Sequence, residues 1–338
     1  VMDVYLPKYE NEESFIMASH VDRLKQSACF KSSEMTCVTC HNPHKSVTNL
    51  SASYFDNKCM QCHSDCKEEE IQNCTSCHMP NSTSTDIQHV SITDHKIAIP
   101  SAIKTKKGNF LGLFAINNDT PTNLSKAKAY LKRFESFEQN PIYLDSAFIL
   151  LNKTTIDFPA FIQYYYLKND NKGLVNFVMS NTIDSLKHNN SDLALAYSRM
   201  AEVFALKNLA VDAKRYYDNA VSLMPFVIDY KLKLGAFLID NKQLKAAKLI
   251  FETALALNPT HKEIHLNLGY IFILQQNFLK AELYLKQAIA LDPDYVLAYE
   301  NLVLSAQMQN KMKDVKVYLN KILEIAPNHN ARLILKNL

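Results

Sequence analysis

Residues 266–293 read LNLGYIFILQQNFLKAELYLKQAIALDP and decide the fold of the carboxyl-terminal part of this chain. Small residues (Gly269, Ala281, Ala288) stand among large apolar ones, as expected where two helices pack closely against each other. Proline recurs with a period of 34 residues, at Pro225, Pro259, Pro293 and Pro327. A 34-residue period predicts a row of helical hairpins that stack on their neighbours, which is an α-solenoid.

The marker residues of this pattern fall at matching offsets before each proline. They are Ala201, Phe204, Ala213, Tyr217 and Ala220; Leu234, Gly235, Ala247, Phe251 and Ala254; Leu268, Gly269, Phe272, Ala281, Leu285 and Ala288; and, in a worn fourth unit, Leu302, Val303, Ala306, Val315, Leu319 and Ile322. The units resemble the tetratricopeptide repeat (TPR) family over about residues 194–338. Residues 331–338 are expected to begin a closing helix.

The amino-terminal part carries a different signal, three copies of Cys-x-x-Cys-His: Cys37–His41, Cys59–His63 and Cys74–His78. This motif is typical of haem c attachment, because the two thiols add to the porphyrin vinyl groups and the adjacent His ligates the iron. Three haem c groups are therefore expected. Their thioether residues would be Cys37, Cys40, Cys59, Cys62, Cys74 and Cys77, with His41, His63 and His78 as proximal iron ligands.

A zinc site is the alternative interpretation of these cysteines. The spacing between the first two Cys-x-x-Cys pairs suits a four-cysteine zinc ribbon. The His after every pair favours haem, and a zinc ribbon would leave the third pair unused. Two cysteines lie outside the motifs, Cys29 and Cys66, and are expected either as a disulfide or as two free buried thiols.

Four other histidines in the first 100 residues are candidates for the distal position on an iron: His20, His44, His89 and His95. His44 follows His41 too closely to reach the far side of the same iron and is expected to serve a neighbouring haem. Three haems need three distal ligands, so one of the four histidines is left over and could ligate a haem outside this segment. Because the sequence starts at Val1, a removed secretion signal and at least one further motif upstream are expected.

The two regions predict different interiors. Residues 29–85 are poor in Leu, Ile and Val, so side-chain burial alone does not offset their ordering entropy, and haem would form the interior. The expected fold is mainly α, a loop-rich, haem-cored multihaem cytochrome c domain followed by a TPR solenoid. The expected organisation is a haem domain at 1–100, a linker at 101–119 in which residues 110–116 form a strand or a buried extended stretch, degenerate helical hairpins at 120–190, and the solenoid with its terminal helix at 191–338.

The chain also resembles multihaem cytochromes c with carboxyl-terminal TPR repeats, which are common in Gram-negative bacteria. The matching segments are Lys25-Gln26-Ser27, Cys37–His44, Cys77-His78-Met79-Pro80, and Thr93–Ile97 with Pro100. The haem part is similar to the lineage of pentahaem nitrite reductase and octahaem hydroxylamine oxidoreductase. That resemblance implies secretion, bis-His haems and electron transfer, and implies that His44 ligates another haem. The chain lacks the Cys-x-x-Cys-Lys motif of the lineage, so its reductase activity is not implied.

These features lead to an expected function. The chain would be a periplasmic, secreted or cell-surface electron carrier of a Gram-negative bacterium, relaying electrons to redox partner proteins or other cytochromes. The TPR arm would dock a partner or form a homo-oligomer or larger assembly, through an inner groove expected at Ala236, Ile239, Asp240, Tyr270, Ile273, Leu274, Leu304 and Met308. That groove could instead hold the chain's own haem domain.

Two other functions remain open, a catalytic multihaem oxidoreductase acting on a small nitrogen or sulfur species and a zinc-ribbon scaffold. The expected electron carrier would not itself be an enzyme. A net charge of +3 gives no indication of nucleic acid binding, and no apolar run is long enough to span a membrane.

Overall fold

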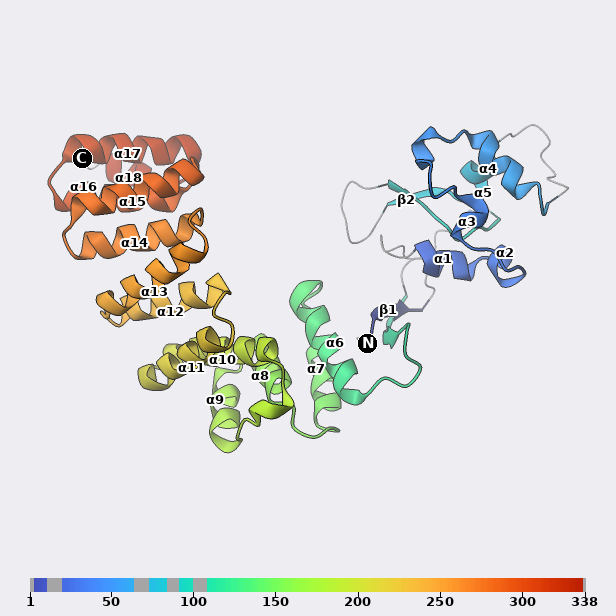
Figure 1. Ribbon diagram of the computed structural model, residues 1–338, viewed down its shortest axis with the longest axis horizontal. Coiled ribbons are helices and arrows are strands. Elements are labelled where there is room, and N and C mark those ends of the chain that lie inside the picture. Colours follow the sequence, from blue (N-terminus) through green and yellow to red (C-terminus); the bar gives the residue numbers. More distant parts are fainter. Residues whose placement is uncertain (1–2, 11–19, 64–72, 84–90, 100–107, 337–338) are drawn as a thin grey trace. The chain divides into compact units, whose positions relative to one another are not determined.

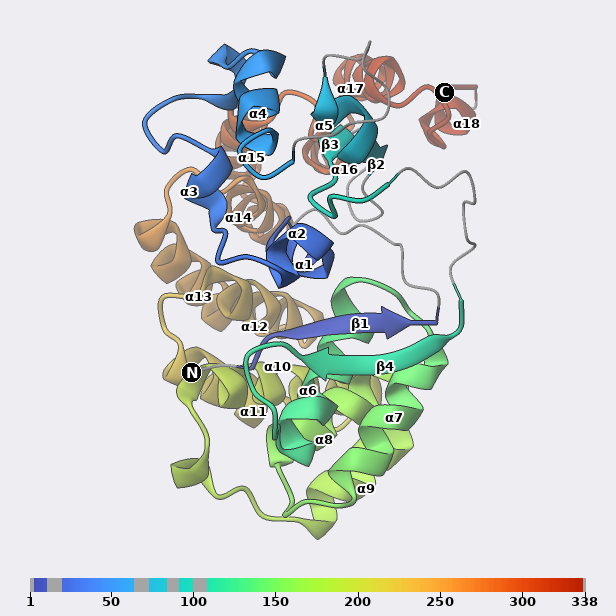
Figure 2. The ribbon, with the colours of Figure 1, turned by 90° about the vertical axis from the view of Figure 1, so that its right-hand side faces the viewer.

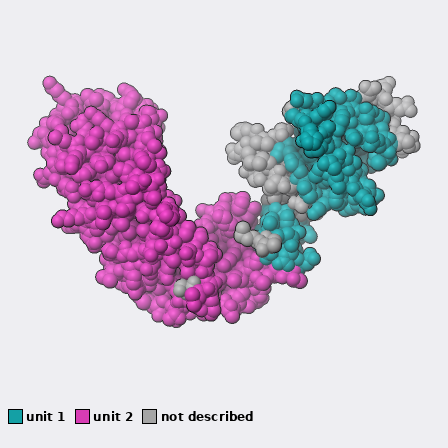
Figure 3. All heavy atoms as spheres, in the orientation of Figure 1, with its two compact units in different colours: residues 1–119 teal, residues 120–338 magenta. Residues whose placement is uncertain are grey.

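The computed structural model describes residues 3–10, 20–63, 73–83, 91–99 and 108–336. The chain forms two compact units, Val1–Asp119 and Thr120–Leu338, coloured separately in Figure 3.

The first unit consists of short elements. Along the chain they are β1 (Tyr5–Tyr9), α1 (His20–Gln26), α2 (Ala28–Lys31), α3 (Cys37–Cys40), the 3₁₀ turn η1 (Val47–Asn49), α4 (Ala52–Cys59), α5 (Cys74–His78), β2 (Asn81–Thr83), β3 (Ser91–Thr93) and β4 (Phe110–Ala115). The extended stretch expected at 110–116 is therefore a strand. Figure 2 shows β4 lying antiparallel to β1, with Tyr5 opposite Ala115 and Tyr9 opposite Phe110.

The described residues in the helical part of the first unit form no apolar core of their own. Across residues 20–63, 73–83 and 91–99, the buried side chains belong to the polar residues Arg23, Ser27, Asp56 and Asp94. Apolar side chains there stand in solvent instead, as Val38 does at 65% exposure and Met60 at 59%. The low Leu, Ile and Val content of this segment accounts for the missing core.

The second unit is a row of helices, shown in chain order in Figure 1. They are α6 (Asn123–Ser136), α7 (Pro141–Leu151), α8 (Phe158–Leu167), α9 (Asn171–Ser180), the 3₁₀ turn η2 (Ser185–Lys187), α10 (Asn190–Leu206), α11 (Ala210–Leu223), α12 (Ile228–Asp240), α13 (Leu244–Leu257), α14 (Lys262–Leu274), α15 (Phe278–Leu291), α16 (Val296–Met308), α17 (Met312–Ile325) and α18 (Ala331–Lys336). The predicted mainly α solenoid of helical hairpins is confirmed.

Repeat markers fill the interior of the solenoid as the period predicts. Phe204, Phe251 and Leu285 are fully buried in continuous apolar clusters. Gly235 and Gly269 allow the first helix of a hairpin to approach the second, since a Cβ on Gly269 would lie 2.8 Å from the Leu285 side chain and one on Gly235 would overlap the Phe251 ring. Each marker proline stands two residues beyond a helix end, where it cannot continue the helix.

A repeated turn identifies how far the hairpin rhythm extends. Asn208, Lys242, Gln276 and Asn310 each follow the first helix of a hairpin with φ between 55° and 59°, the left-handed conformation. Asn169, between α8 and α9, has φ 56° and the same pair of backbone hydrogen bonds, from Asn169 N to Tyr166 O and from Asp170 N to Tyr165 O. The hairpin α8–α9 is thus built like the repeats, although its sequence lacks their markers.

Candidate functional site

The Cys-x-x-Cys-His motifs lie on short helical turns of the first unit. Both α3 and α5 begin at the first cysteine of a motif, and Cys59 ends α4. Cysteines three residues apart on such a turn share one face, and the His follows at once: His41 N donates to Cys37 O at 2.9 Å, and His63 N to Cys59 O at 3.0 Å. This arrangement presents two thiols and an imidazole together.

The six motif cysteines form no disulfide bonds. Cys37 and Cys62 are exposed, and the other four are partly buried. Burial raises the pKa of the Cys59 thiol to about 11 and also raises the pKa of Cys40.

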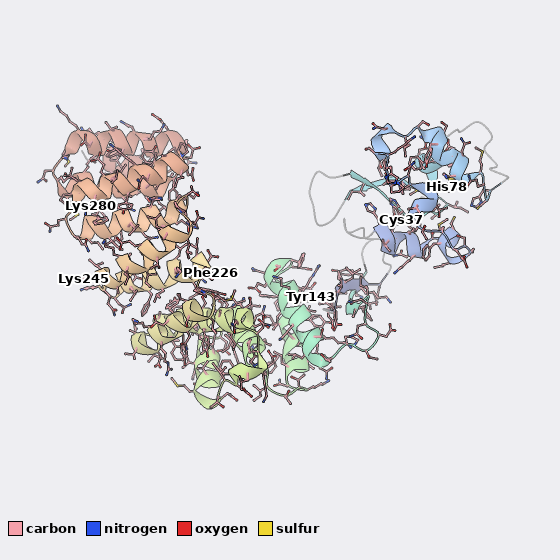
Figure 4. The ribbon with its side chains drawn as sticks, viewed as in Figure 1. Cys37, His78, Tyr143, Phe226, Lys245 and Lys280 are labelled. Atoms are coloured by element: carbon pink, nitrogen blue, oxygen red, sulfur yellow. The ribbon has the colours of Figure 1, made fainter. Side chains whose placement is uncertain are left out.

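Three histidines far apart in the sequence come together in the first unit. The rings of His41 and His95 are 6.1 Å apart between centroids, and those of His20 and His95 are 4.5 Å apart. His78 lies on the third motif, visible with Cys37 in Figure 4, and its Nδ1 is 3.0 Å from Ala98 O. A carbonyl oxygen only accepts hydrogen bonds, so Nδ1 of His78 carries the proton and Nε2 has the free lone pair.

The remaining candidates fall elsewhere. His44 is exposed, with its backbone N bonded to Asn42 Oδ1. His89 and Cys66 lie outside the described residues. Cys29 Sγ lies 3.9 Å from Nε2 of His63. Because Cys66 is outside the described residues, the choice between a Cys29–Cys66 disulfide and two free thiols stays open.

A buried ion pair that the sequence did not predict lies next to His95. Arg23 on α1 binds Asp94, with Nε donating to Oδ1 at 2.8 Å and a second bond from the guanidinium to Oδ2. Both residues are buried. The bonds from Arg23 and from Lys96 N hold the pKa of Asp94 below its usual range despite its burial. The residues are separated by 71 positions, and no local pattern connects them.

Within the described part of the chain, no three His, Cys, Asp or Glu side chains are placed to hold one metal ion. The four-cysteine zinc ribbon, built from Cys37, Cys40, Cys59 and Cys62, therefore finds no support in the geometry.

The second unit offers a surface along the first helices of its hairpins. At one end a polar network closes this surface: Arg199 on α10 is 5% exposed and binds Glu135 on α6 at 2.5 Å. On α10, Glu202 accepts from the Tyr166 hydroxyl at 2.5 Å and pairs with Lys233 on α12. Burial, followed by the Glu202 hydrogen bond, raises the pKa of Tyr166 to about 12.

Farther along, the same surface is apolar and partly open. The 34-residue spacing places Ala236, Tyr270 and Leu304 at the position that Glu202 has on α10. Leu274 is 40% exposed and Met308 46% exposed. Ala236 and Asp240 are exposed as expected, and Ile239, Tyr270 and Leu304 are half-buried. Ile273 is fully buried, so its placement in the groove was wrong: its side chain belongs to the apolar cluster between hairpins.

A basic rim lies at the turns of the middle repeats. A hollow of about 500 Å³ is lined by Lys242, Gln243, Leu244, Lys245, Ala246 and Gln275. Lys248 and Lys280 both lie over the ring of Phe272, at 5.9 and 5.5 Å from its centroid. Figure 4 labels Lys245 and Lys280 on this part of the solenoid.

Comparison with known proteins identifies the repeats. The tetratricopeptide repeat model matches residues 228–261 and 262–295, so the chain contains TPR repeats there. No curated protein matches the sequence. None of the described helices is long and apolar enough to cross a membrane.

Several solved TPR structures are similar to the chain. YrrB, described as a TPR protein with an unusual peptide-binding site, is 19% identical over 63% of this chain and all of its own, with a TM-score of 0.40. PilW, a type IV pilus biogenesis factor, is 21% identical over 50% of this chain and 76% of its own, with a TM-score of 0.43. PilF of Pseudomonas aeruginosa is 13% identical over 64% of this chain and 95% of its own, with a TM-score of 0.43.

These findings correct the expected function. The family match identifies TPR repeats, a protein-interaction module, and the described residues form no metal-binding group, so an electron-transfer cytochrome is not supported. The physical reason is that Cys-x-x-Cys-His specifies local attachment chemistry. A relay needs several irons at short mutual distances, and the spacing of the motifs along the chain does not fix those distances.

Proposed function

We propose that the protein is an interaction scaffold whose TPR solenoid docks a protein partner on the surface lined by α12, α14 and α16. The observation that carries this proposal is the contrast along that surface. The polar network of Arg199, Glu135 and Glu202 fills it at one end, and apolar side chains stand open to solvent beyond it. Stacked repeats offer an extended surface that suits a helix or strand of a partner.

A site-specific cross-linker tests the docking surface in the full chain. A photoreactive amino acid replaces Leu274 on this surface or, as the matched control, Leu249 on the outer helix α13, which is 61% exposed. We expect a discrete cross-linked partner, identified by mass spectrometry, from position 274. Leu274→Glu in a chain that carries the cross-linker at Met308 should abolish that product, and Leu249→Glu should not. Equal cross-linking from positions 274 and 249 would contradict the proposal.

We further propose that the three motifs of the first unit attach haem c. The supporting observations are the shared face of each cysteine pair, the free Nε2 of His78, and the absence of buried apolar side chains among the described residues 20–99. Bound haem supplies a large apolar disc and an iron that accepts imidazole ligands. His41, His63 and His78 would hold the irons. This attachment implies a location outside the cytoplasm.

Mass and colour test the attachment. The full chain, produced in cells that mature c-type cytochromes, should gain the mass of three haems and show the sharp reduced bands of haem c. Changing both cysteines of one motif to serine should remove one haem from the mass. A colourless, folded chain with the mass of bare polypeptide would refute haem attachment and leave the docking proposal intact.

A further inference from the structure

The position of His95 is fixed from two sides. The β2–β3 hairpin returns the chain next to the third motif, where Asp94 N donates to Pro80 O at 3.0 Å. From the other side, Arg23 on α1 binds the Asp94 carboxylate in the buried ion pair. These bonds hold Asp94, the residue next to His95, from both sides.

The hydrogen bonds of His95 show which nitrogen can bind a metal. Nδ1 lies 3.0 Å from Thr93 O and 3.1 Å from Nδ1 of His20. Because a carbonyl only accepts, Nδ1 of His95 carries the proton, and Nε2 keeps its lone pair. This is the usual arrangement of a metal-binding imidazole, whose other nitrogen donates to a carbonyl.

The separation of His41 and His95 matches a pair of axial ligands. Metal–imidazole bonds are about 2 Å long, and the ring centre lies about 1.1 Å beyond the bonding nitrogen. Two imidazoles on opposite sides of one iron therefore have centroids about 6.2 Å apart. The observed His41–His95 separation is 6.1 Å. His20 does not fit this arrangement with His95, because its ring is only 4.5 Å away and lies next to the protonated Nδ1.

We propose that His41 and His95 are the two axial ligands of the iron in the haem attached at Cys37 and Cys40, and that the Arg23–Asp94 ion pair is the device that positions His95. This pairing rests on the proposed haem attachment. It selects one distal ligand for the first haem from the candidate histidines of the sequence. Arg23 and Asp94 act through His95 and are positioning residues.

The spin state of the irons tests the pairing in the full, haem-loaded chain. His95→Ala should keep three haems by mass and convert one of the three irons to high spin in electron paramagnetic resonance, with restoration of low spin by added imidazole. His95→Met should instead give a methionine–iron charge-transfer band. His329→Ala, in the second unit, is the control and should leave every iron unchanged.

The ion pair has its own spectroscopic prediction. Arg23→Gln should give a mixture of high- and low-spin iron at the same haem content, and Arg23→Lys should partly restore the low-spin form. Unchanged spectra in both His95 variants would overturn the pairing. A wild-type chain without haem would refute the attachment itself, so the two failures are distinguishable. If His95→Ala yields no folded protein, His95→Met and Arg23→Gln decide the question.

Discussion

The two units of this molecule differ in the kind of side chain that they bury. The solenoid buries Phe204, Phe251 and Leu285 completely in clusters that continue from hairpin to hairpin. In the first unit, the described residues 20–63, 73–83 and 91–99 bury the polar side chains of Arg23, Ser27, Asp56 and Asp94 and leave Val38 in solvent. The repeats are therefore stabilised by their own side chains, whereas in the motif-bearing segment the proposed haem groups would supply the apolar interior.

The largest expected effect comes from preventing haem attachment. A chain with all six motif cysteines changed to serine should lose the structure of residues 20–63, 73–83 and 91–99, because these described residues bury no apolar side chain that would offset their ordering entropy. Hydrogen exchange should show rapid exchange there and unchanged protection from α6 to α17. Retained protection in the first unit would show that the polypeptide folds without the cofactor and would remove the contrast between the units.

Truncating core side chains sharpens the comparison. Phe251→Ala leaves a cavity in the main cluster of the solenoid and should lower the free energy of unfolding by about 3–5 kcal/mol. Val38→Ala in the first unit should change it by less than about 0.5 kcal/mol, because this side chain is 65% exposed. Urea unfolding followed by circular dichroism measures both. Comparable losses would mean that Val38 is buried in the folded protein.

A methyl group added at a close helix contact should have a smaller effect. Gly235→Ala places a Cβ against the Phe251 ring and should destabilise the solenoid by about 1–3 kcal/mol. The neighbouring Ala236→Ser is the control, since residue 236 is exposed on the same helix and should tolerate the change. Thermal unfolding of the two variants should separate them clearly, and an unchanged midpoint for Gly235→Ala would contradict the close packing.

The smallest expected effect is a pH dependence confined to the solenoid. The folded-state pKa of Tyr166 is raised to about 12, above the ordinary value of 10, so the unfolded chain loses this proton first as pH rises. The contribution to stability is complete below pH 10 and is lost between pH 10 and 12. Urea midpoints measured over this range should fall, and Tyr166→Phe should reduce the slope. An unaltered slope would assign the pH dependence to other tyrosines.

Much of the solenoid was readable from sequence because its repeats are local. The 34-residue proline period, the glycines at close contacts and the buried markers are all determined within one hairpin or its neighbour. Residue 273 was misplaced because a helix position between the groove and the next hairpin can face either one. The resemblance of α8–α9 to the repeats was only partly visible, since it resides in the backbone at Asn169 rather than in marker side chains.

Less of the candidate site than of the solenoid could be predicted from the sequence. The sequence by itself determined the thiol spacing and the adjacent histidine, because these are properties of five consecutive residues, and haem attachment at the motifs is proposed from them. Only the tertiary structure decided that His95 lies beside His41 and His20, and that Arg23 binds Asp94. These contacts join residues more than 50 positions apart, and such pairings follow from how the whole unit folds, which no local pattern specifies.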